Sequence, residues 1–296
     1  MERYIYRKDD EFGTEIVTIR VGKGGQIQDF MVYEKVIRAS SAFVDNALKG
    51  PWLETTTRLI SLPDFASDTF DRYHRWLLTG NLHSKLELKG ILELYKKQEP
   101  AIVSSPQLQN TYGRHVELWQ LCQLSELGHY LLDTTFMDTI NDAILSCMVE
   151  TRKVPSQFPI RAASEIYKAL PVTSLSRSLL SDIAAWTVTG DRLAFYRKCM
   201  EKPDIDLCPD FCLDVLVAMA QRFTSTPTSK SPFEDWDTSC KYHSHGDEKP
   251  CYREEIKGLD SSQKKRPTPE DGEASAAKRQ KLRQNTRAIF DTEEMG

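Results

Sequence analysis

Large apolar residues become scarce after Phe223, and this break limits which part of the chain can build a core. The 73 residues 224–296 contain 16 hydrophobic residues, and only six of these are Leu, Ile, Val or Phe. A segment so poor in large apolar groups cannot offset the entropy lost when its backbone becomes ordered. It opens with the linker-like run TSTPTSKSP at 224–232. We therefore predict that residues 224–296 form a mostly disordered tail.

The composition of the whole chain excludes several classes of protein. Its 296 residues carry a formal net charge of -4, too close to neutral for a protein that coats nucleic acid. No run approaches the roughly 20 apolar residues that span a bilayer, and Met1–Arg7 lacks the apolar core of a signal peptide. The seven cysteines are odd in number and scattered, which favours reduced thiols over a secreted disulfide scaffold.

The first part of the body mixes strands and helices. Residues 16–21, IVTIRV, alternate apolar and polar side chains and predict a half-buried strand. A glycine-rich turn at 22–25 and a second alternating segment through Phe30 and Val32 complete a predicted hairpin. Residues 34–49 have helical periodicity. Further along, 59–62 predicts a short strand, and 66–79 predicts a helix that ends at Gly80.

The second part of the body is expected to be all helical. Apolar stripes run through 116–131 and 136–147, and prolines punctuate further helices up to Phe223. Residues 83–115 predict a long connection. The fold class that follows is α+β: a small sheet with helices, then an all-helical extension, then the tail.

Four segments in this order resemble the BTB/POZ domain of proteins abundant in filamentous fungi. They read VTIRVG, FMVYEKVIRASSAFVDNALKGPW, ISLPDFASDTFDRYHRWLLTG and LWQLCQLSELGHYLLDTTFMDTINDAI. The resemblance implies an N-terminal segment at 1–15, a BTB/POZ domain at 16–150, a helical extension at 151–223 and the tail at 224–296. Tyr33 stands where many family members have His, and the 83–115 connection is longer than in compact members.

The resemblance implies a non-enzymatic protein–protein interaction module, and the sequence contains no recognisable catalytic motif. In adaptors of cullin-RING ubiquitin ligases, a hydrophobic-x-Glu element meets the cullin, and Trp52 and Glu54 occupy this position. The alternatives are that Trp52 packs locally while Glu54 is solvated, and that the protein is a nuclear scaffold or transcription-associated BTB protein without a ligase role. We expect protein partners, with a homodimer left open through Tyr4–Tyr6 as an edge strand, and no direct nucleic-acid or membrane binding.

The tail carries one set of metal-binding residue types, Cys240, His243, His245 and Cys251. Two thiolates and two imidazoles are suitable ligands for tetrahedral zinc. The spacing is tight, so an uncoordinated tail is the alternative. We expect no other cofactor.

Two basic clusters later in the tail predict nuclear import. They are separated by the eleven residues 267–277, which matches a two-part import signal, and they consist of Lys264, Lys265, Arg266, Lys278, Arg279 and Lys281. The alternative is a solvated run of charge. The expected location is the nucleus, the cytoplasm or both.

Overall fold

A computed structural model describes the chain at residues 12–85, 87, 89–90, 106–151, 158, 160–191, 193–194, 197, 207–224, 231–246 and 250–254. The chain divides into two compact units, residues 1–246 and 247–296. The elements below belong to the first unit, and the second is described only at 250–254. The expected N-terminal segment is described from Phe12 onward, so Tyr4–Tyr6 lies outside the described residues.

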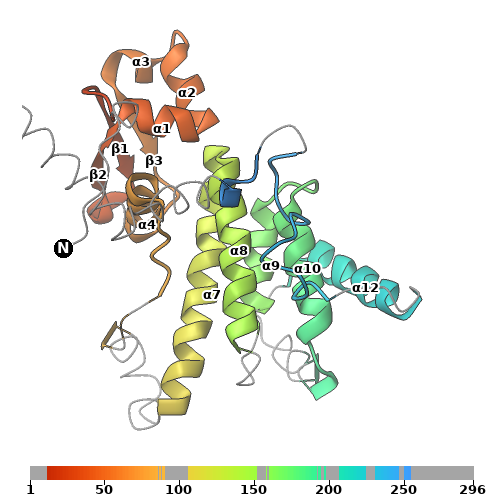
Figure 1. The fold of residues 1–296 in the computed structure, drawn as a ribbon. Helices are drawn as coiled ribbons and strands as arrows, with labels where there is room; N and C mark the ends of the chain where they lie inside the picture. Colours follow the sequence, from red (N-terminus) through yellow and green to blue (C-terminus); the bar gives the residue numbers. More distant parts are fainter. Residues whose placement is uncertain are drawn as a thin grey trace, which may run out of the picture. The chain divides into compact units, whose positions relative to one another are not determined.

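A three-stranded sheet with the order β2-β1-β3 forms the N-terminal part of the fold (Figure 1). β1 (Ile16–Val21) pairs antiparallel with β2 (Gln28–Tyr33) and parallel with β3 (Leu59–Leu62). The alternation in β1 places Val17, Ile19 and Val21 in the core with no exposed surface. The predicted hairpin and third strand are therefore confirmed.

The hairpin turn depends on one glycine. Gly22 has a φ of +95°, and a Cβ atom there would approach the backbone oxygen of Gln26 to 2.5 Å. Only glycine fits this backbone conformation at such a close approach. The turn continues as the short 3-10 helix η2 (Gly24–Gln26) and then enters β2.

Three helices lie between the hairpin and the third strand, and a fourth follows that strand. α1 (Glu34–Ser40) and α2 (Ala42–Lys49) divide the predicted helical region 34–49, because Ser41 has an extended backbone. The Ser41 hydroxyl accepts a hydrogen bond of 3.1 Å from the Val44 N–H and thereby caps α2. α3 (Leu53–Thr57) precedes β3 and was not expected from the sequence. α4 (Ser67–Thr79) ends at Gly80 as predicted, with a φ of +68°.

The described residues after α4 contain further helices. They are α7 (Pro106–Leu131), α8 (Thr134–Thr151), α9 (Ile160–Ala169), α10 (Leu175–Thr187) and α12 (Pro209–Thr224). α7 begins within the segment predicted to be a connection, because Pro106 suits the first position of a helix and helix-forming residues follow it. α7 and α8 run side by side (Figure 1). None of the described helices is long and apolar enough to cross a membrane.

One hydrophobic core runs from the sheet through α4, α7 and α8 to the later helices. The mixed α+β class is thus confirmed, with a small sheet and mostly helices. α12 ends at Thr224, one residue beyond the predicted end of the helical extension.

The first part of the expected tail, residues 231–246, belongs to the compact unit. Phe233 and Tyr242 are buried members of the core, and Trp236 packs against it. This differs from the tail predicted from residue 224 onward. The average over 73 residues hides a local group of aromatic side chains that lie in the core or at its edge.

Candidate functional site

Three metal-binding side chains come together at the end of this segment. Cys240, His243 and His245 each offer one ligand atom, and these atoms lie within 4.8 Å of one another. The fourth predicted ligand, Cys251, belongs to the second unit. The Cys240 carbonyl accepts a hydrogen bond of 3.0 Å from the His243 N–H, so a tight turn sets the spacing of the first two residues. Three of the predicted ligands therefore form a cluster that could bind a metal.

His243 is oriented by a carboxylate on α8. Its Nε2 atom lies 2.9 Å from Oδ1 of Asp142, and only 1 % of its side chain is exposed. Histidines that bind metals usually donate their other ring N–H to a carboxylate, which fixes the tautomer and the ring orientation. With Nε2 directed at Asp142, a metal would be bound through Nδ1.

His245 has the opposite arrangement of ring nitrogens. Its Nδ1 lies 2.5 Å from the carbonyl oxygen of Gly246, so this nitrogen carries the donated proton. Its Nε2 is buried and has no hydrogen-bond partner among the described residues. A buried polar atom without a partner is costly. A metal bound at Nε2 would supply the missing interaction.

Next to the cluster, α8 presents a row of buried polar residues, which we call the polar stripe. Asp138, Asn141 and Asp142 are spaced i, i+3 and i+4, so they lie on one face of the helix, and each is at most 9 % exposed. Asn141 Nδ2 donates to the Tyr242 carbonyl at 2.7 Å, and Asp138 Oδ1 accepts from the Ser244 N–H at 2.6 Å. Burial raises the pKa of Asp138 above its ordinary value.

α10 provides a second attachment. The Tyr242 hydroxyl donates to Oδ2 of Asp182 at 2.7 Å, and Lys241 forms an ion pair with the same oxygen at 2.8 Å. Because Asp182 is a strong acceptor shared by two donors, it anchors two consecutive residues of the turn. Asp138, Asn141, Asp142 and Asp182 have no recognisable motif in the sequence. Their only signal is a polar face on helices that are otherwise apolar.

The predicted docking residues Trp52 and Glu54 lie at the start of α3. The side chain of Trp52 is 61 % exposed and that of Leu53 is 73 % exposed. The indole lies over Gly50, where a Cβ atom would come within 2.2 Å of the Trp52 Nε1 atom. Thr55 donates to the Gly50 carbonyl at 2.6 Å and holds this loop in place. Trp52 thus packs locally on a glycine while most of its surface remains exposed.

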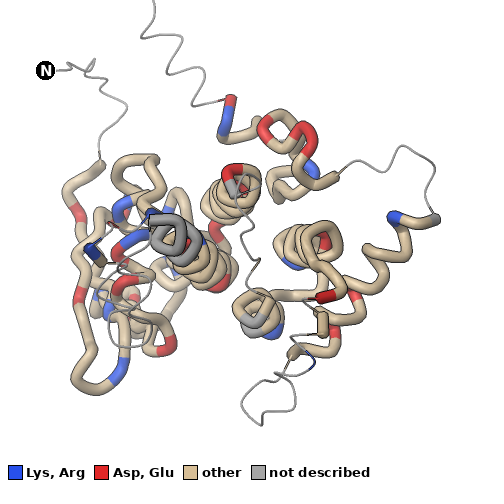
Figure 2. The backbone as a smooth tube through the Cα atoms, turned by 90° about the horizontal axis from the view of Figure 1, so that it is seen from below, with Lys and Arg blue, Asp and Glu red and all other residues tan. Residues whose placement is uncertain are grey.

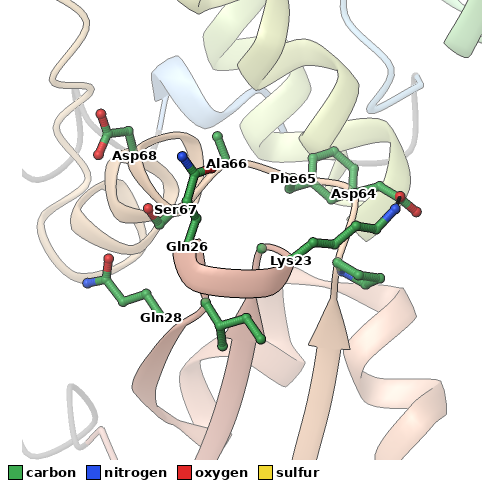
Figure 3. Close-up of a pocket in the computed structure, with 11 residues that line it drawn as sticks. Lys23, Gln26, Gln28, Asp64, Phe65, Ala66, Ser67 and Asp68 are labelled. Atoms are coloured by element: carbon green, nitrogen blue, oxygen red, sulfur yellow. Dashed lines mark hydrogen bonds and ion pairs between the residues drawn. The ribbon is translucent and has the colours of Figure 1, made fainter.

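A shallow hollow of about 720 Å³ lies between the hairpin turn and the loop before α4 (Figure 3). Lys23 reaches Asp64 across it, and their charged atoms are 2.5 Å apart. Both side chains are largely exposed, so water screens this ion pair strongly. Its lining offers a lysine, two aspartates and neutral side chains, with no paired nucleophile and base.

The six residues of the predicted import signal, Lys264, Lys265, Arg266, Lys278, Arg279 and Lys281, lie outside the described residues.

No protein-family model and no curated protein matches the chain.

Proposed function

We propose that this protein is a non-enzymatic protein–protein interaction module of the BTB/POZ type that acts as an adaptor of a cullin-RING ubiquitin ligase. The order of the elements supports the fold assignment, because a hairpin, a helix pair, a strand and a further helix follow one another as in the sequence resemblance. The observation that carries the functional proposal is the exposed Trp52–Leu53 pair beside Glu54.

An exposed tryptophan supported by a glycine is a suitable anchor for a partner. Its indole lies against Gly50, and a side chain that already rests on its own protein loses less conformational freedom on binding. Large aromatic side chains of this kind carry much of the binding energy in protein interfaces. Glu54, at the first turn of α3, adds a charge that can accept hydrogen bonds from the partner.

The charge distribution also favours a protein partner. Lys and Arg positions are interspersed with Asp and Glu positions along the described backbone (Figure 2). Nucleic-acid binding usually relies on a basic stripe on one face, whereas interspersed charges of both signs are suited to a protein partner. The alternative function is a nuclear scaffold or transcription-associated protein without a ligase role, which the two basic clusters of the tail favour.

Binding of a purified cullin N-terminal domain tests the adaptor function. Trp52→Ala should weaken the complex at least about tenfold, because an anchor of this kind contributes about 2 kcal/mol or more. Glu54→Ala should also weaken it. Trp119→Ala is a control with another partly exposed tryptophan, 39 % exposed on α7, and should bind as the wild type does.

The outcome separates the two functions. Since Trp52 is mostly exposed, its replacement should change the melting temperature little, so a loss of binding would report the interface. If the wild-type protein binds no cullin, the adaptor function is wrong and the scaffold function takes its place.

We also propose that Cys251 completes the cluster as its fourth ligand and that the metal is zinc. Two thiolates with two imidazoles match the ligand set of structural zinc sites, and four protein ligands leave no open position for a substrate. Elemental analysis of the purified full-length chain should find one zinc per molecule. The double variant Cys240→Ser and Cys251→Ser should contain no zinc, whereas Cys122→Ala, on α7, should still contain one zinc per molecule.

A further inference from the structure

We infer that zinc at this cluster fastens residues 231–246 onto α8, and that Asp142 is the positioning residue that holds His243 ready to bind the metal. This inference rests on the proposed zinc site. It adds the residue that tunes the site and the structural consequence of metal binding.

The polar stripe on α8 provides polar contacts of the segment. Asp138, Asn141 and Asp142 are buried, yet residues 242–244 supply a partner to each of them. If the segment moved away, three polar groups would exchange these partners for water. Hydrogen bonds of this kind add little net stability when water can replace them, so the polar contacts alone hold the segment weakly.

The apolar contacts of the segment are also few. Phe233 and Tyr242 are its members of the core, with Trp236 at the edge. Several residues between them are exposed and still have to be ordered at an entropic cost. A metal that joins Cys240, His243 and His245 cross-links the end of the segment and lowers the entropy of its released state, as in small zinc-dependent folds.

Asp142 links the metal site to the helix. Its Oδ1 lies 2.9 Å from Nε2 of His243, a predicted ligand. The negative charge of this carboxylate makes the imidazole a stronger electron donor and fixes its tautomer. His243 cannot bind the metal in this geometry unless the segment lies on α8, so metal binding and docking support each other.

The buried Nε2 of His245 is an independent sign that a ligand belongs here. It has no hydrogen-bond partner among the described residues, while its other nitrogen is engaged by the Gly246 carbonyl. The docked segment thus presents His245 in a tautomer that accepts a metal at Nε2. Docking without metal would leave this atom unsatisfied.

The first experiment compares Asp142→Asn with the matched control Asp237→Asn in the full chain. Both remove one negative charge, but Asp237 is an exposed residue of the segment, whereas Asp142 is buried. Zinc affinity, measured by competition with a chromophoric chelator, should fall about tenfold or more in Asp142→Asn. It should stay within about twofold of the wild type in Asp237→Asn.

A conservative variant separates positioning from a general loss of structure. Asp142→Glu retains the carboxylate and should recover most of the affinity that Asp142→Asn loses. Cobalt substituted for zinc should give the spectrum of a tetrahedral site with two sulfur and two nitrogen ligands in the wild type and in both Asp142 variants. An intact spectrum with weakened affinity identifies Asp142 as acting through His243.

The second experiment measures amide hydrogen exchange at residues 241–244 with zinc and with a chelator. Removal of zinc should speed exchange at these amides by at least about tenfold, while β1 amides should not change. If the wild type binds no zinc, the proposed site and this inference both fall. If zinc binds but Asp142→Asn keeps wild-type affinity, or if exchange is the same with and without zinc, only the present inference is overturned.

Discussion

The hydroxyl of Tyr73 on α4 donates a hydrogen bond of 3.0 Å to Oδ2 of Asp133, and both side chains are buried. The other carboxylate oxygen of Asp133 accepts from the Phe136 N–H at 2.9 Å and caps α8. The Ser40 hydroxyl, at the end of α1, also donates to Oδ2. One carboxylate therefore joins α1, α4 and the start of α8. Burial raises the pKa of Asp133 and that of Tyr73.

Replacement of Tyr73 should weaken this junction. Tyr73→Phe removes one donor from a buried acceptor, and we expect the free energy of unfolding to fall by about 1.5–3 kcal/mol. Chemical denaturation measures this change. Tyr130→Phe is the control, because Tyr130 is 45 % exposed, and its loss should stay within about 0.5 kcal/mol. Equal losses in free energy of unfolding in the two variants would show that the Tyr73–Asp133 hydrogen bond stabilises the protein no more than an exposed tyrosine hydroxyl does.

The stability of the protein should depend on pH through His129. Burial lowers the pKa of this imidazole below its ordinary value of 6.5, and its Nε2 lies 2.7 Å from the Ser174 hydroxyl. The unfolded chain therefore takes up the proton first. As the pH falls from 6.5 to the lowered folded value, this group makes unfolding progressively easier, and above 6.5 its contribution is constant.

Denaturation of His129→Gln across this pH range tests the assignment. As the pH falls below 6.5, the free energy of unfolding should decrease more in the wild type than in His129→Gln. His83→Gln, at an exposed position, should show the same pH dependence as the wild type. A wild-type pH dependence in His129→Gln would mean that another group is responsible.

Much of the fold could be predicted from local patterns. The strict alternation in 16–21 and the glycine turn after it predict the hairpin. Both signals are local, because the alternation of side chains and the conformational freedom of glycine depend only on neighbouring residues. The break at Ser41 follows from a side chain that can cap the next helix. Pairing of β1 with β3 connects segments about forty residues apart. The sequence suggested the third strand but not its place beside β1.

The candidate metal centre likewise has a part that local sequence patterns predict and a part that depends on distant residues. The four ligands were predictable, since cysteines and histidines occur within twelve residues and their chemistry is specific. Asp142 was not, because it lies about a hundred residues earlier in the chain and reads as an ordinary polar position on a helix. The ordering of 231–246 was also missed. It depends on the tertiary partners Asn141 and Asp182, which composition cannot reveal.

The thiols of the chain should react in two groups. Burial raises the pKa of Cys122 to about 12, and burial together with the charge of Glu117 raises that of Cys147 to about 12. At pH 8 only about one part in 10⁴ of such a thiol is ionised, and the thiolate is the reactive form. Cys240 is exposed. It should resist alkylation while zinc is bound and react first once a chelator removes the metal.

Mass spectrometry of alkylated peptides measures this order. Cys122 and Cys147 should be modified only after denaturant is added. Cys240→Ser should remove the chelator-dependent labelling of residue 240 and leave the slow reaction of Cys122 and Cys147 unchanged. Rapid labelling of Cys240 in zinc-loaded protein would contradict coordination by its sulfur.

The basic clusters of the tail should direct nuclear import. Between Ser261 and Arg287 the chain has eight Lys or Arg against three Asp or Glu, a local charge of +5 in a chain of net charge -4. Replacing Lys278, Arg279 and Lys281 with Ala removes the second cluster, and a fluorescent fusion should then accumulate in the cytoplasm. Quantitative imaging of the nuclear-to-cytoplasmic ratio measures the effect.

The matched control removes the same number of positive charges from the folded part of the chain. Lys23, Lys35 and Lys49 are exposed, and their replacement by Ala should leave the ratio unchanged. Because import carriers bind extended basic segments through paired acidic sites, the position of the charge should matter more than its amount. Loss of nuclear accumulation in both variants would attribute the effect to net charge, and no loss in either would exclude the tail clusters as the import signal.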